Sequence, residues 1–436
     1  MQKKPTVAIL TQGCKVNQYE SEAIAELFCK RGFAVLSPGD CCDVYVINTC
    51  TVTAESDRKA GQLARRVHTQ NPNAFVLMTG CFSQSHPQKA AAIEGVDYVC
   101  GNTQKLSVVS AAEALLSGKH SPSEAIVHVE DVNAAPFEPM CITRFDRTRA
   151  YVKIEDGCEN RCAYCAIPAA RGRVRSKPLD QVVEEVTQLT AGGCREIVLT
   201  GIETASWGKD FPNADLAQLL EAVDAIPGIG RVRLGSLDPS LMKQAFVDRI
   251  ATLPSLTPHF HISMQSGSSR VLATMKRKYN AEQAMEGIRR LRAAFPALEL
   301  TTDFIVGFPG ETDEDFEKTM LFAKEADFLA MHVFAYSRRT GTVAASLPDP
   351  VPNDVKKGRS AALIALGADL RRGRLERALQ APHRRVLFET YENGMAMGHT
   401  DSFLEVMAPS PIPLHSELRQ VSLIKVEGDR LLAHIL

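Results

Sequence analysis

The sequence predicts an α/β chain of three parts: a doubly wound parallel-sheet domain, a central open six-stranded (β/α)6 barrel, and a small five-stranded antiparallel β-barrel. Three observations predict it. Strand-like apolar runs alternate with helical stretches over most of the chain, only six such units follow residue 144, and short strands separated by turns replace them near the end. At 436 residues the chain is too long for one core. We expect domains at 1–118, 144–380 and 381–436, with a linker at 119–143.

The first domain rests on three short, partly β-branched apolar runs at 7–11, 44–49 and 75–79, with helical stretches at about 18–30 and 54–69. Strands that alternate with helices indicate a parallel sheet covered by helices on both faces. In such a sheet the carboxyl ends of the strands meet at one edge, and ligands bind there.

A cysteine follows each of these three strands: Cys14, Cys50 and Cys81. Because the strand ends converge, the three thiolates can meet although they lie far apart in the sequence. A glycine precedes Cys14 and Cys81 and lets the backbone approach a bulky ligand closely. The alternative is three ordinary buried cysteines, since a free cysteine behaves as a small apolar residue. Cys100, after the next apolar run, is a possible fourth ligand on the same logic.

The central domain is predicted from six strand candidates at 150–155, 196–200, 232–236, 260–265, 300–306 and 330–336. Helical stretches at about 179–191, 216–225, 281–294 and 313–325 lie between them. Six units fall short of the eight that close a TIM barrel, so this partial TIM barrel should stay open on one side. An open side suits a large substrate such as a folded RNA or a protein loop.

Cys158, Cys162 and Cys165 follow the first of these strands in a C-x3-C-x2-C run. Three thiolates leave one iron of an iron–sulfur cluster free to bind and cleave a small molecule. A structural zinc site is the first alternative, but it needs four ligands, and no second C-x2-C or H-x3-5-H completes this one. A redox pair at the last two cysteines is the other, and it leaves Cys158 unexplained. Tyr164, inside the motif, is placed to pack against a bound adenine or to serve ordinary packing.

The C-x3-C-x-aromatic-C run after a strand resembles the radical S-adenosyl-L-methionine (SAM) superfamily. In that superfamily SAM binds the free iron and is cleaved to a 5′-deoxyadenosyl radical. The resemblance implies that polar residues at the barrel strand ends line the SAM pocket. These residues are Glu203, Ser263, Gln265 and Asp303. Many members also have a Gly-Gly-Glu that binds the methionine amino group; Gly192 and Gly193 lie near that place, although the acidic residue is missing here.

The sequence around the first three cysteines narrows the resemblance to the methylthiotransferases. The runs at 12–22 (QGCKVNQYESE), 48–53 (NTCTVT) and 79–81 (TGC) are similar to that family, as are 199–202, 263–268, 303–311 and 336–342, with Ala335 where proline is common. The resemblance covers nearly the whole chain and is closest to the branch that acts on N6-threonylcarbamoyladenosine in tRNA. It leaves out Cys100. It implies an auxiliary 4Fe-4S cluster on Cys14, Cys50 and Cys81, and the radical SAM cluster on Cys158, Cys162 and Cys165.

After a charged helix at about 354–379, five short strands are predicted at 385–391, 395–400, 403–407, 421–426 and 431–435. They indicate an OB-like antiparallel barrel, a fold that commonly presents a curved face to nucleic acid. The barrel resembles the TRAM domain that accompanies tRNA-modifying methylthiotransferases. Two groups of basic residues are candidates for phosphate contact; for the group near the barrel, a solvated helix face is the usual reason for such a run. The groups are Arg371, Arg372, Arg374, Arg377, Arg384 and Arg385 near the barrel, and Arg171, Arg173 and Arg175 after the cysteine motif.

The charge and composition bear on partners and location. The formal net charge is −1, so nucleic-acid contact has to come from local basic patches. The sequence shows no charged and then apolar leader, and no apolar run approaches the roughly 18 residues of a membrane span. We therefore expect a cytoplasmic protein without membrane contact, whose twelve cysteines are reduced thiols and not a disulfide framework.

The resemblance implies an enzyme with two 4Fe-4S clusters and SAM that inserts a methylthio group at C2 of N6-threonylcarbamoyladenosine beside the tRNA anticodon. A SAM-derived radical activates the target carbon, and a second SAM methylates sulfur held at the auxiliary cluster. A one-electron donor protein of the flavodoxin or ferredoxin type is needed, and we expect a monomer. Two near alternatives change the target to an isopentenyladenosine of tRNA or an aspartate of a ribosomal protein. A remote alternative is an RNA-binding iron–sulfur sensor without turnover.

Overall fold

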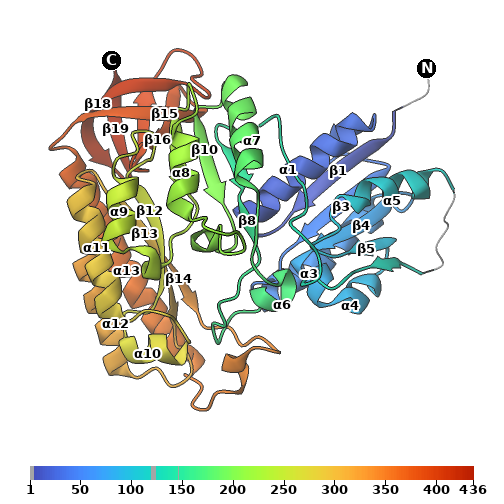
Figure 1. The fold of residues 1–436 in the computed structure, drawn as a ribbon, viewed down its shortest axis with the longest axis horizontal. Coiled ribbons are helices and arrows are strands. Elements are labelled where there is room, and N and C mark those ends of the chain that lie inside the picture. Colours follow the sequence, from blue (N-terminus) through green and yellow to red (C-terminus); the bar gives the residue numbers. More distant parts are fainter. Residues whose placement is uncertain (1–3, 119–123, 146) are drawn as a thin grey trace.

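The computed structural model describes residues 4–118, 124–145 and 147–436, and the chain folds into three units (Figure 1). The N-terminal unit, in blue, lies against the central unit, in green to orange, and the C-terminal unit, in red, sits at one end of the central one. The first residues of the predicted linker, 119–123, lie outside the described residues. Among the residues that are described, no helix is long and apolar enough to cross a membrane.

The N-terminal unit is a parallel sheet with the strand order β2-β1-β3-β4-β5-β6. Its elements are β1 (Thr6–Thr11), α1 (Lys15–Lys30), β2 (Ala34–Leu36), β3 (Val44–Thr49), α2 (Ala54–Gln70), β4 (Phe75–Gly80), α3 (Cys81–Ser85), α4 (Pro87–Ala91), β5 (Tyr98–Cys100), α5 (Ser107–Leu116) and β6 (Ile126–His128). Successive strand residues point to opposite faces. Val7 packs in a core with α1 and α5, and Ala8 in a core with α2, α3 and α4. Helices on both faces confirm the predicted doubly wound domain.

Part of the segment predicted as a linker pairs with this sheet. β6 runs parallel to β5, with Val127 opposite Val99, and the chain then crosses the boundary between the first two units. There the carbonyl of Met140 accepts hydrogen bonds from Tyr19 Oη at 2.7 Å and from Lys177 Nζ at 2.9 Å. The segment therefore contacts both the N-terminal and the central unit.

The central unit has parallel strands in two sheets, β7-β10-β11 and β12-β13-β14. A bridge joins them: the N–H of Leu237 donates to the carbonyl of His261 at 2.8 Å, and the N–H of Ser263 donates to the carbonyl of Leu237 at 3.2 Å. In the described part of the chain β7 and β14 each pair with one neighbour, so the series stays open. The strands are β7 (Ala150–Lys153), β8 (Glu155–Asp156), β9 (Arg175–Ser176), β10 (Glu196–Thr200), β11 (Arg231–Leu234), β12 (His259–Gln265), β13 (Glu299–Val306) and β14 (Ala330–Ala335), with β8 and β9 forming a separate antiparallel pair. The helices are α6 (Ile167–Arg171), α7 (Leu179–Ala191), α8 (Leu216–Asp224), α9 (Gln244–Ile250), α10 (Ser269–Thr274), α11 (Ala281–Ala294), α12 (Asp313–Ala326) and α13 (Asn353–Ala378), with 3-10 turns η1 (Thr204–Ser206), η2 (Pro239–Leu241) and η3 (Val343–Ser346).

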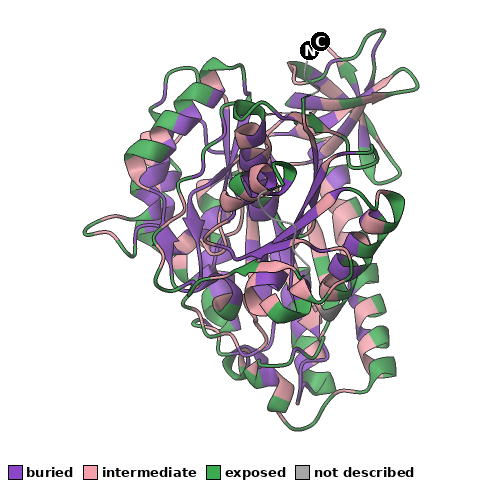
Figure 2. Cartoon of the chain, turned by 90° about the vertical axis from the view of Figure 1, so that its right-hand side faces the viewer, coloured by how far each residue is buried: buried purple, intermediate pink, exposed green. Residues whose placement is uncertain are grey.

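The two faces of the central strands have different surroundings. Phe304 and Val306 of β13 are buried in the core that includes residues of α11 and α12. Asp303 and Ile305 alternate with them, point to the opposite, inner face and are half-buried. Figure 2 shows the corresponding pattern in the whole chain, with buried residues in the strands and exposed residues on the outer sides of helices. The inner face of the six parallel strands of the central unit can therefore carry polar side chains.

The C-terminal unit is a closed five-stranded barrel with the order β15-β16-β17-β19-β18. The prediction of an antiparallel barrel was wrong at one seam: β17 and β19 pair in parallel, with Leu431 opposite Val406, while the other neighbours are antiparallel. The reason is parity, because strand directions cannot alternate all the way around a closed ring with an odd number of strands. The strands are β15 (His383–Glu392), β16 (Met395–Thr400), β17 (Glu405–Pro409), β18 (Leu418–Glu427) and β19 (Arg430–Ile435).

This barrel is fixed to the amino ends of the central strands. Phe403, between β16 and β17, stacks on His259 and His399 with ring centroids 4.8 and 4.4 Å away. The buried guanidinium of Arg233 lies over the Phe403 ring, and its Nη2 donates to the carbonyl of Asp401 at 3.1 Å. The barrel thus occupies the end of the central unit where the amino ends of the central strands lie. These contacts leave the carboxyl ends of the central strands uncovered.

Candidate active site

The first group of cysteines lies in one loop, between β8 and α6. The loop begins at Gly157, whose φ of 87° favours glycine and whose Cβ, if present, would overlap the carbonyl oxygen of Arg173. The N–H of Cys165 donates to the carbonyl of Cys162 at 3.0 Å, which turns the chain within the motif. These two cysteines and Cys158 are each half-buried. Local backbone geometry is therefore enough to gather this group.

Arg277 supplies a positive charge beside these thiols. Its Nη1 donates to Cys162 Sγ at 3.3 Å, and its Nη2 donates to Asp238 Oδ2 at 2.7 Å. Burial raises the pKa of Cys158 to about 12 and the pKa of Cys165 to about 11. Without a metal these two thiols keep their protons at neutral pH, so binding of iron by their sulfurs has to release protons.

Two of the residues predicted to line a SAM pocket lie beside this loop, and a third, Tyr164, belongs to the loop. Glu203, which follows β10, accepts a hydrogen bond from Asn160 Nδ2 at 3.2 Å, and burial raises the pKa of Glu203 to about 7. The carbonyl of Ser263 accepts from Arg277 Nη2 at 3.1 Å. Tyr164 packs against a small apolar cluster from α10 and the loops near it. The structure brings Glu203 and Ser263 to the loop that contains Tyr164.

Gly192 and Gly193 lie away from the loop. Gly192 caps the end of α7, and its N–H donates to the carbonyl of Gln188 at 2.9 Å. Both glycines precede β10, whereas the cysteine loop follows the carboxyl end of the parallel strand β7. The carboxyl end of β10 carries Gly201, where a Cβ would lie 2.8 Å from Glu155 Oε2. The two predicted glycines thus stand at the opposite end of the strand from the site.

A row of side chains crosses the inner face of β12, β13 and β14. Asp303 lies in the middle, with His261 Nε2 3.2 Å from one carboxylate oxygen and His332 Nδ1 3.5 Å from the other. Phe334, further along β14, is half exposed. Gln265 ends β12 at an irregularity in the strand, with a φ of 68°. The structure therefore places Asp303 among histidines on the open inner face.

The second group of cysteines is assembled from three strand–helix junctions. Cys14 precedes α1, Cys50 follows β3, and Cys81 begins α3, at strand ends that the parallel register of β1, β3 and β4 aligns at one edge. Gly13 has a φ of 107°, and a Cβ there would lie 3.1 Å from Cys50 Sγ. Burial raises the pKa of Cys50, and the charges of Cys81 and Cys14 add to this effect. The structure brings these three thiols to one edge of the sheet.

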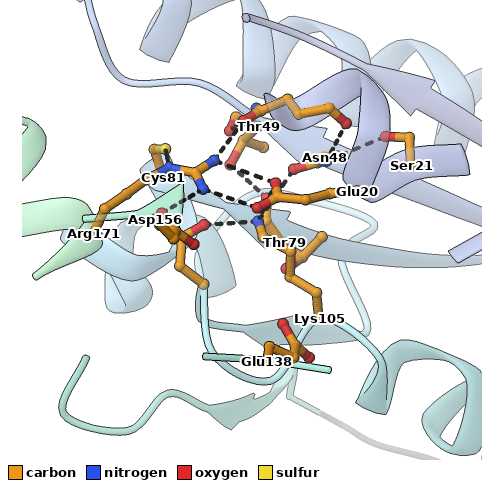
Figure 3. A network of polar contacts seen from close by, with 12 residues as sticks. Glu20, Ser21, Asn48, Thr49, Thr79, Cys81, Lys105, Glu138, Asp156 and Arg171 are labelled. Atoms are coloured by element: carbon orange, nitrogen blue, oxygen red, sulfur yellow. Dashed lines mark hydrogen bonds and ion pairs between the residues drawn. The ribbon is translucent and has the colours of Figure 1, made fainter. Parts of the chain in front are cut away.

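Arg171 connects the two groups (Figure 3). It ends α6, which lies beside α3 in Figure 1, and its side chain is fully buried. Its Nε donates to Cys81 Sγ at 3.3 Å, and its Nη2 donates to Asn17 Oδ1 at 2.6 Å. Its Nη1 donates to Glu20 Oε1 at 2.8 Å and to Asp156 Oδ1 at 3.0 Å. One guanidinium from the central unit therefore binds a cysteine of the N-terminal unit.

Buried cations surround the second group. Besides Arg171, Lys105 Nζ lies 3.2 Å from Glu20 Oε2, and Lys153 Nζ lies 2.8 Å from both Glu20 Oε1 and Asp156 Oδ2. Burial opposes the ionisation of these two carboxyls, but the neighbouring cations hold both pKa values well below their usual range. Arg175 Nη2 also lies 3.6 Å from Asp156 Oδ2, so four cations face two carboxylates. The thiolates of an iron–sulfur cluster would add the missing negative charge, so the residues fit such a cluster.

The structure has all twelve cysteines as free thiols. Cys100 lies in the apolar core between the N-terminal sheet and α5 and does not join Cys14, Cys50 and Cys81. In the described part of the chain no three cysteine, histidine or acidic side chains converge as they would on a single metal ion. The cysteines of a four-iron cluster each bind a different iron, so their sulfurs need not meet at one point.

The phosphate-binding prediction was wrong for two arginines after the motif. Arg171 is enclosed as described above, and Arg175 is buried with Nη1 donating to the carbonyl of Val132 at 2.6 Å. Arg173 is exposed. The first two guanidiniums are therefore structural, because carboxylates and carbonyls inside the protein already use their donors.

The basic strip near the C-terminal barrel divides into two parts. Arg374 and Arg377 of α13 pair with Asp327 at 3.0 and 2.5 Å, so they hold this helix to the central unit. Arg384 and Arg385, at the start of β15, line a hollow between the barrel and Pro258 and Ala297 of the central unit, and Arg385 Nη2 lies 3.7 Å from Asp401 Oδ2. The second pair is the better placed to meet a phosphate backbone.

Sequence reasoning missed Arg277, Asp238 and Asn17. Asp238 follows the carboxyl end of β11, so the strand-end rule that selected Glu203 was enough to find it. Arg277 comes from the turn between α10 and α11, and Asn17 from the first turn of α1. Asn17 lies three residues after Cys14, a helical spacing that was enough to find it, whereas Arg277 has no sequence spacing that points to a cysteine.

Comparison with known proteins places these features in a family. Residues 152–323 match the radical SAM superfamily, and residues 6–101 match the uncharacterized protein family UPF0004. The threonylcarbamoyladenosine tRNA methylthiotransferase MtaB of Bacillus subtilis (strain 168) is 38% identical over 426 residues, which cover 96% of this chain and 94% of that protein. The chain belongs to the radical SAM methylthiotransferases.

Two further proteins define the breadth of the similarity. The tRNA-2-methylthio-N(6)-dimethylallyladenosine synthase of Bordetella pertussis is 38% identical to this methylthiotransferase over 367 residues, 82% of this chain and 81% of that one. The radical SAM methyltransferase TsrM from Kitasatospora setae, solved with cobalamin and a [4Fe-4S] cluster bound, has a TM-score of 0.59 at 15% identity, over 79% of this chain and 77% of that chain. The latter confirms the α/β fold. The expected activity class, a radical SAM tRNA methylthiotransferase that uses SAM and [4Fe-4S] clusters, is confirmed by the family.

Proposed function

We propose that this methylthiotransferase inserts a methylthio group at C2 of N6-threonylcarbamoyladenosine next to the anticodon of tRNA. The observation that carries the proposal is the presence of two groups of three free thiols at strand ends of adjoining units. When bound, the clusters and SAM supply the radical that opens the C–H bond and the sulfur and methyl group that replace the hydrogen. The SAM cluster is assigned to Cys158, Cys162 and Cys165, and the auxiliary cluster to Cys14, Cys50 and Cys81.

The side chains around each group position this chemistry. Three thiolates leave one iron of each cluster open to a further ligand. Tyr164 offers an aromatic face to the adenine of SAM, and Glu203 offers a carboxylate to its amino group. Arg277 and Arg171 each place an N–H donor 3.3 Å from one ligand sulfur.

The inner face of the central unit supports the choice of substrate. The threonylcarbamoyl group carries a carboxylate, a hydroxyl and an amide, which need polar partners when they leave water. His261, Asp303 and His332 form a polar row there, and the charge of Asp303 also acts on Lys15, next to Cys14. An isopentenyl group has no polar atom to offer this row, so it would gain none of these contacts.

The remaining parts of the proposal concern partners. Phe334 offers a half-exposed ring on which a base can stack, and Arg384 and Arg385 contact the tRNA backbone. The reaction consumes single electrons, and a flavodoxin-type or ferredoxin-type protein supplies them. The enzyme acts as a monomer in the cytoplasm.

Nucleoside analysis tests the proposal. The gene is expressed in a bacterial strain whose tRNA contains N6-threonylcarbamoyladenosine and whose own methylthiotransferase of this type is deleted. We expect the 2-methylthio derivative in hydrolysed tRNA with the wild-type gene and not with Cys162→Ala. The proposal is overturned if isopentenyladenosine or a ribosomal-protein aspartate gains the methylthio group instead. Purified protein that binds iron but forms no 5′-deoxyadenosine from SAM and dithionite would indicate a non-catalytic sensor.

A further inference from the structure

We infer that Arg171 is a positioning residue for the auxiliary cysteine group: its guanidinium orients Cys81 as a ligand and fixes that group against the loop of the radical SAM cysteines. The inference rests on the cluster assignments of the proposed function. It concerns how the two centres are held and tuned relative to each other, which the family resemblance does not specify.

The contacts of Arg171 in the N-terminal unit fix the direction of its donors. Nε donates to Cys81 Sγ at 3.3 Å. Nη2 donates to both Asn17 Oδ1, at 2.6 Å, and Glu20 Oε2, at 3.2 Å. A guanidinium presents five N–H donors in a rigid plane. With its Nη atoms held by Asn17 and Glu20, the Nε–H has one direction left, which is toward the sulfur. Asn17 also lies three residues after Cys14, so the same guanidinium is tied to two of the three cysteine segments.

The contacts of Arg171 in the central unit tie it to the other cysteine group. Its Nη1 donates to Asp156 Oδ1 at 3.0 Å, and the same oxygen accepts from the N–H of Gly157 at 2.9 Å. Gly157 directly precedes Cys158, and α6, which ends at Arg171, follows Cys165. Arg171 is thus held from both sides of the radical SAM loop. A displacement of that loop has to move the donor on Cys81.

Docking of the two units does not by itself require this arginine. Asn102 Nδ2 donates to the carbonyl of Ala170 at 2.7 Å across the same boundary, and Lys153 Nζ binds Glu20 Oε1 at 2.8 Å. Burying one more guanidinium is expensive unless charged partners compensate it. Hydrogen bonds to the sulfurs of a cluster are one of the factors that set its reduction potential. An N–H donor withdraws charge from the thiolate and favours the reduced cluster, so Arg171 raises the potential of the auxiliary cluster.

Arg277 offers a matched control. Its Nη1 lies 3.3 Å from Cys162 Sγ, the same separation as between Arg171 Nε and Cys81 Sγ, but both residues belong to the central unit. Arg171→Lys and Arg277→Lys each keep the positive charge and lose the planar fork of donors. Asn102→Ala loosens the same boundary as Arg171→Lys without changing a charge or a donor to sulfur, and it also removes the oxygen that accepts from Lys105 Nζ at 2.7 Å.

The experiment uses full-length protein, reconstituted anaerobically with iron and sulfide, in two backgrounds. Alanine at 158, 162 and 165 isolates the auxiliary cluster, and alanine at 14, 50 and 81 isolates the SAM cluster. In each background we measure iron retention against a chelator and the midpoint potential by EPR-monitored titration. We expect Arg171→Lys to lower the auxiliary potential and to weaken its iron retention roughly 10- to 100-fold, as loss of a partner beyond the ligands does elsewhere. Arg277→Lys should lower the potential and weaken the iron retention of the SAM cluster only.

Two outcomes overturn the inference. One is an auxiliary cluster whose potential and EPR signal are unchanged by Arg171→Lys. The other is an equal shift in Asn102→Ala, which would mean that docking alone matters. Arg171→Gln is the second variant if Arg171→Lys does not fold, and it should lower the auxiliary potential further because the charge is lost as well. A background that never holds its cluster contradicts the cluster assignments of the proposed function and is thus distinguishable from failure of Arg171→Lys.

Discussion

The two cysteine groups differ in how the chain assembles them. Cys158, Cys162 and Cys165 come from one loop after one strand, whereas the other group comes from three junctions of a sheet. Each group has one sulfur 3.3 Å from an arginine nitrogen. Arg277 reaches its cysteine within the central unit, but Arg171 reaches across a domain boundary.

This difference determines what each group depends on. The loop needs a few local backbone conformations, so it should survive changes elsewhere in the molecule. The assembled group needs the register of three parallel strands and the docking of a second unit, so distant changes should reach it. A segment held by fewer long-range contacts opens more independently of the rest. The two groups should therefore respond differently to the same kind of substitution.

Removal of either cysteine group should have the largest effect. Alanine at all three positions of one group should lower bound iron from about eight to about four per chain, because each group is expected to hold one four-iron cluster. The variant at 158, 162 and 165 should lose 5′-deoxyadenosine formation, and the variant at 14, 50 and 81 should keep it. Both should lose the methylthiolated nucleoside. Iron analysis and product chromatography measure these outcomes.

A matched control for this pair uses cysteines outside both groups. Cys29, Cys41 and Cys141 are exposed, and a triple serine variant should keep about eight irons and full activity. If that variant also loses half of its iron, the assignment of clusters to the two groups is wrong.

Most strands could be predicted from periodicity alone. The six predicted runs of the central unit each overlap one of β7, β10, β11, β12, β13 and β14, since short β-branched runs between helices have few other readings. The parallel seam of the C-terminal barrel was missed because pairing direction depends on closure of the ring, which no single strand records. β6 was missed because a run of three residues carries too little periodicity.

The candidate site could be predicted only in part for a related reason. A cysteine that follows a strand can be recognised from the neighbouring sequence alone, so both cysteine groups could be predicted. Gly192 and Gly193 show the limit, because a sequence distance does not say which end of a parallel strand a residue occupies. Arg171 shows another: in the run 171–175 it was predicted to belong to a basic patch for phosphate contact, while its partners Glu20 and Asp156 lie in other parts of the chain.

Glycine substitutions sharpen the comparison at the level of the backbone. Gly157 and Gly80 have φ values of 87° and 99°, and a Cβ would overlap a backbone atom at both. Each alanine variant should lose about four irons, those of its own group, and each should lower the melting temperature. The positive φ alone costs about 1 to 2 kcal/mol, and the overlap adds to it. Iron content and thermal unfolding check both.

Gly193→Ala is the control for these variants. Its φ is 92°, but a Cβ there meets no atom within 4 Å. It should therefore cost about 1 kcal/mol of stability and leave the iron content and SAM cleavage unchanged. A loss of SAM cleavage without unfolding would restore the reading in which this glycine binds the methionine end of SAM.

The charges at the boundary of the two units make a pH-dependent prediction. Burial raises the pKa of Glu138 from 4.5 to about 7, and one of its oxygens accepts from the N–H of Leu106 at 3.0 Å. Because the folded protein holds the proton more tightly than the unfolded chain, this stabilisation is full below pH 4.5 and is lost as the pH rises through 7. Glu138→Gln should thus match the parent near pH 5 and be more stable by about 2 to 3 kcal/mol at pH 8. Thermal unfolding across this range measures it, and a difference that does not change with pH contradicts it.

The smallest effect is expected at the C-terminal barrel, far from either cysteine group. Arg384→Ala with Arg385→Ala should weaken tRNA binding at low salt and lower the slope of log affinity against log salt by about 1 for each phosphate that is no longer neutralised. Arg374→Ala is the matched control, because its charge is already paired with Glu299 and Asp327 at 2.7 and 3.0 Å; it should lower stability and leave the salt slope unchanged. Neither variant should change the iron content, since the barrel sits at the end of the central unit opposite the cysteine-bearing strand ends. If the slope falls equally in both variants, the division of the basic strip into structural and RNA-facing parts is wrong.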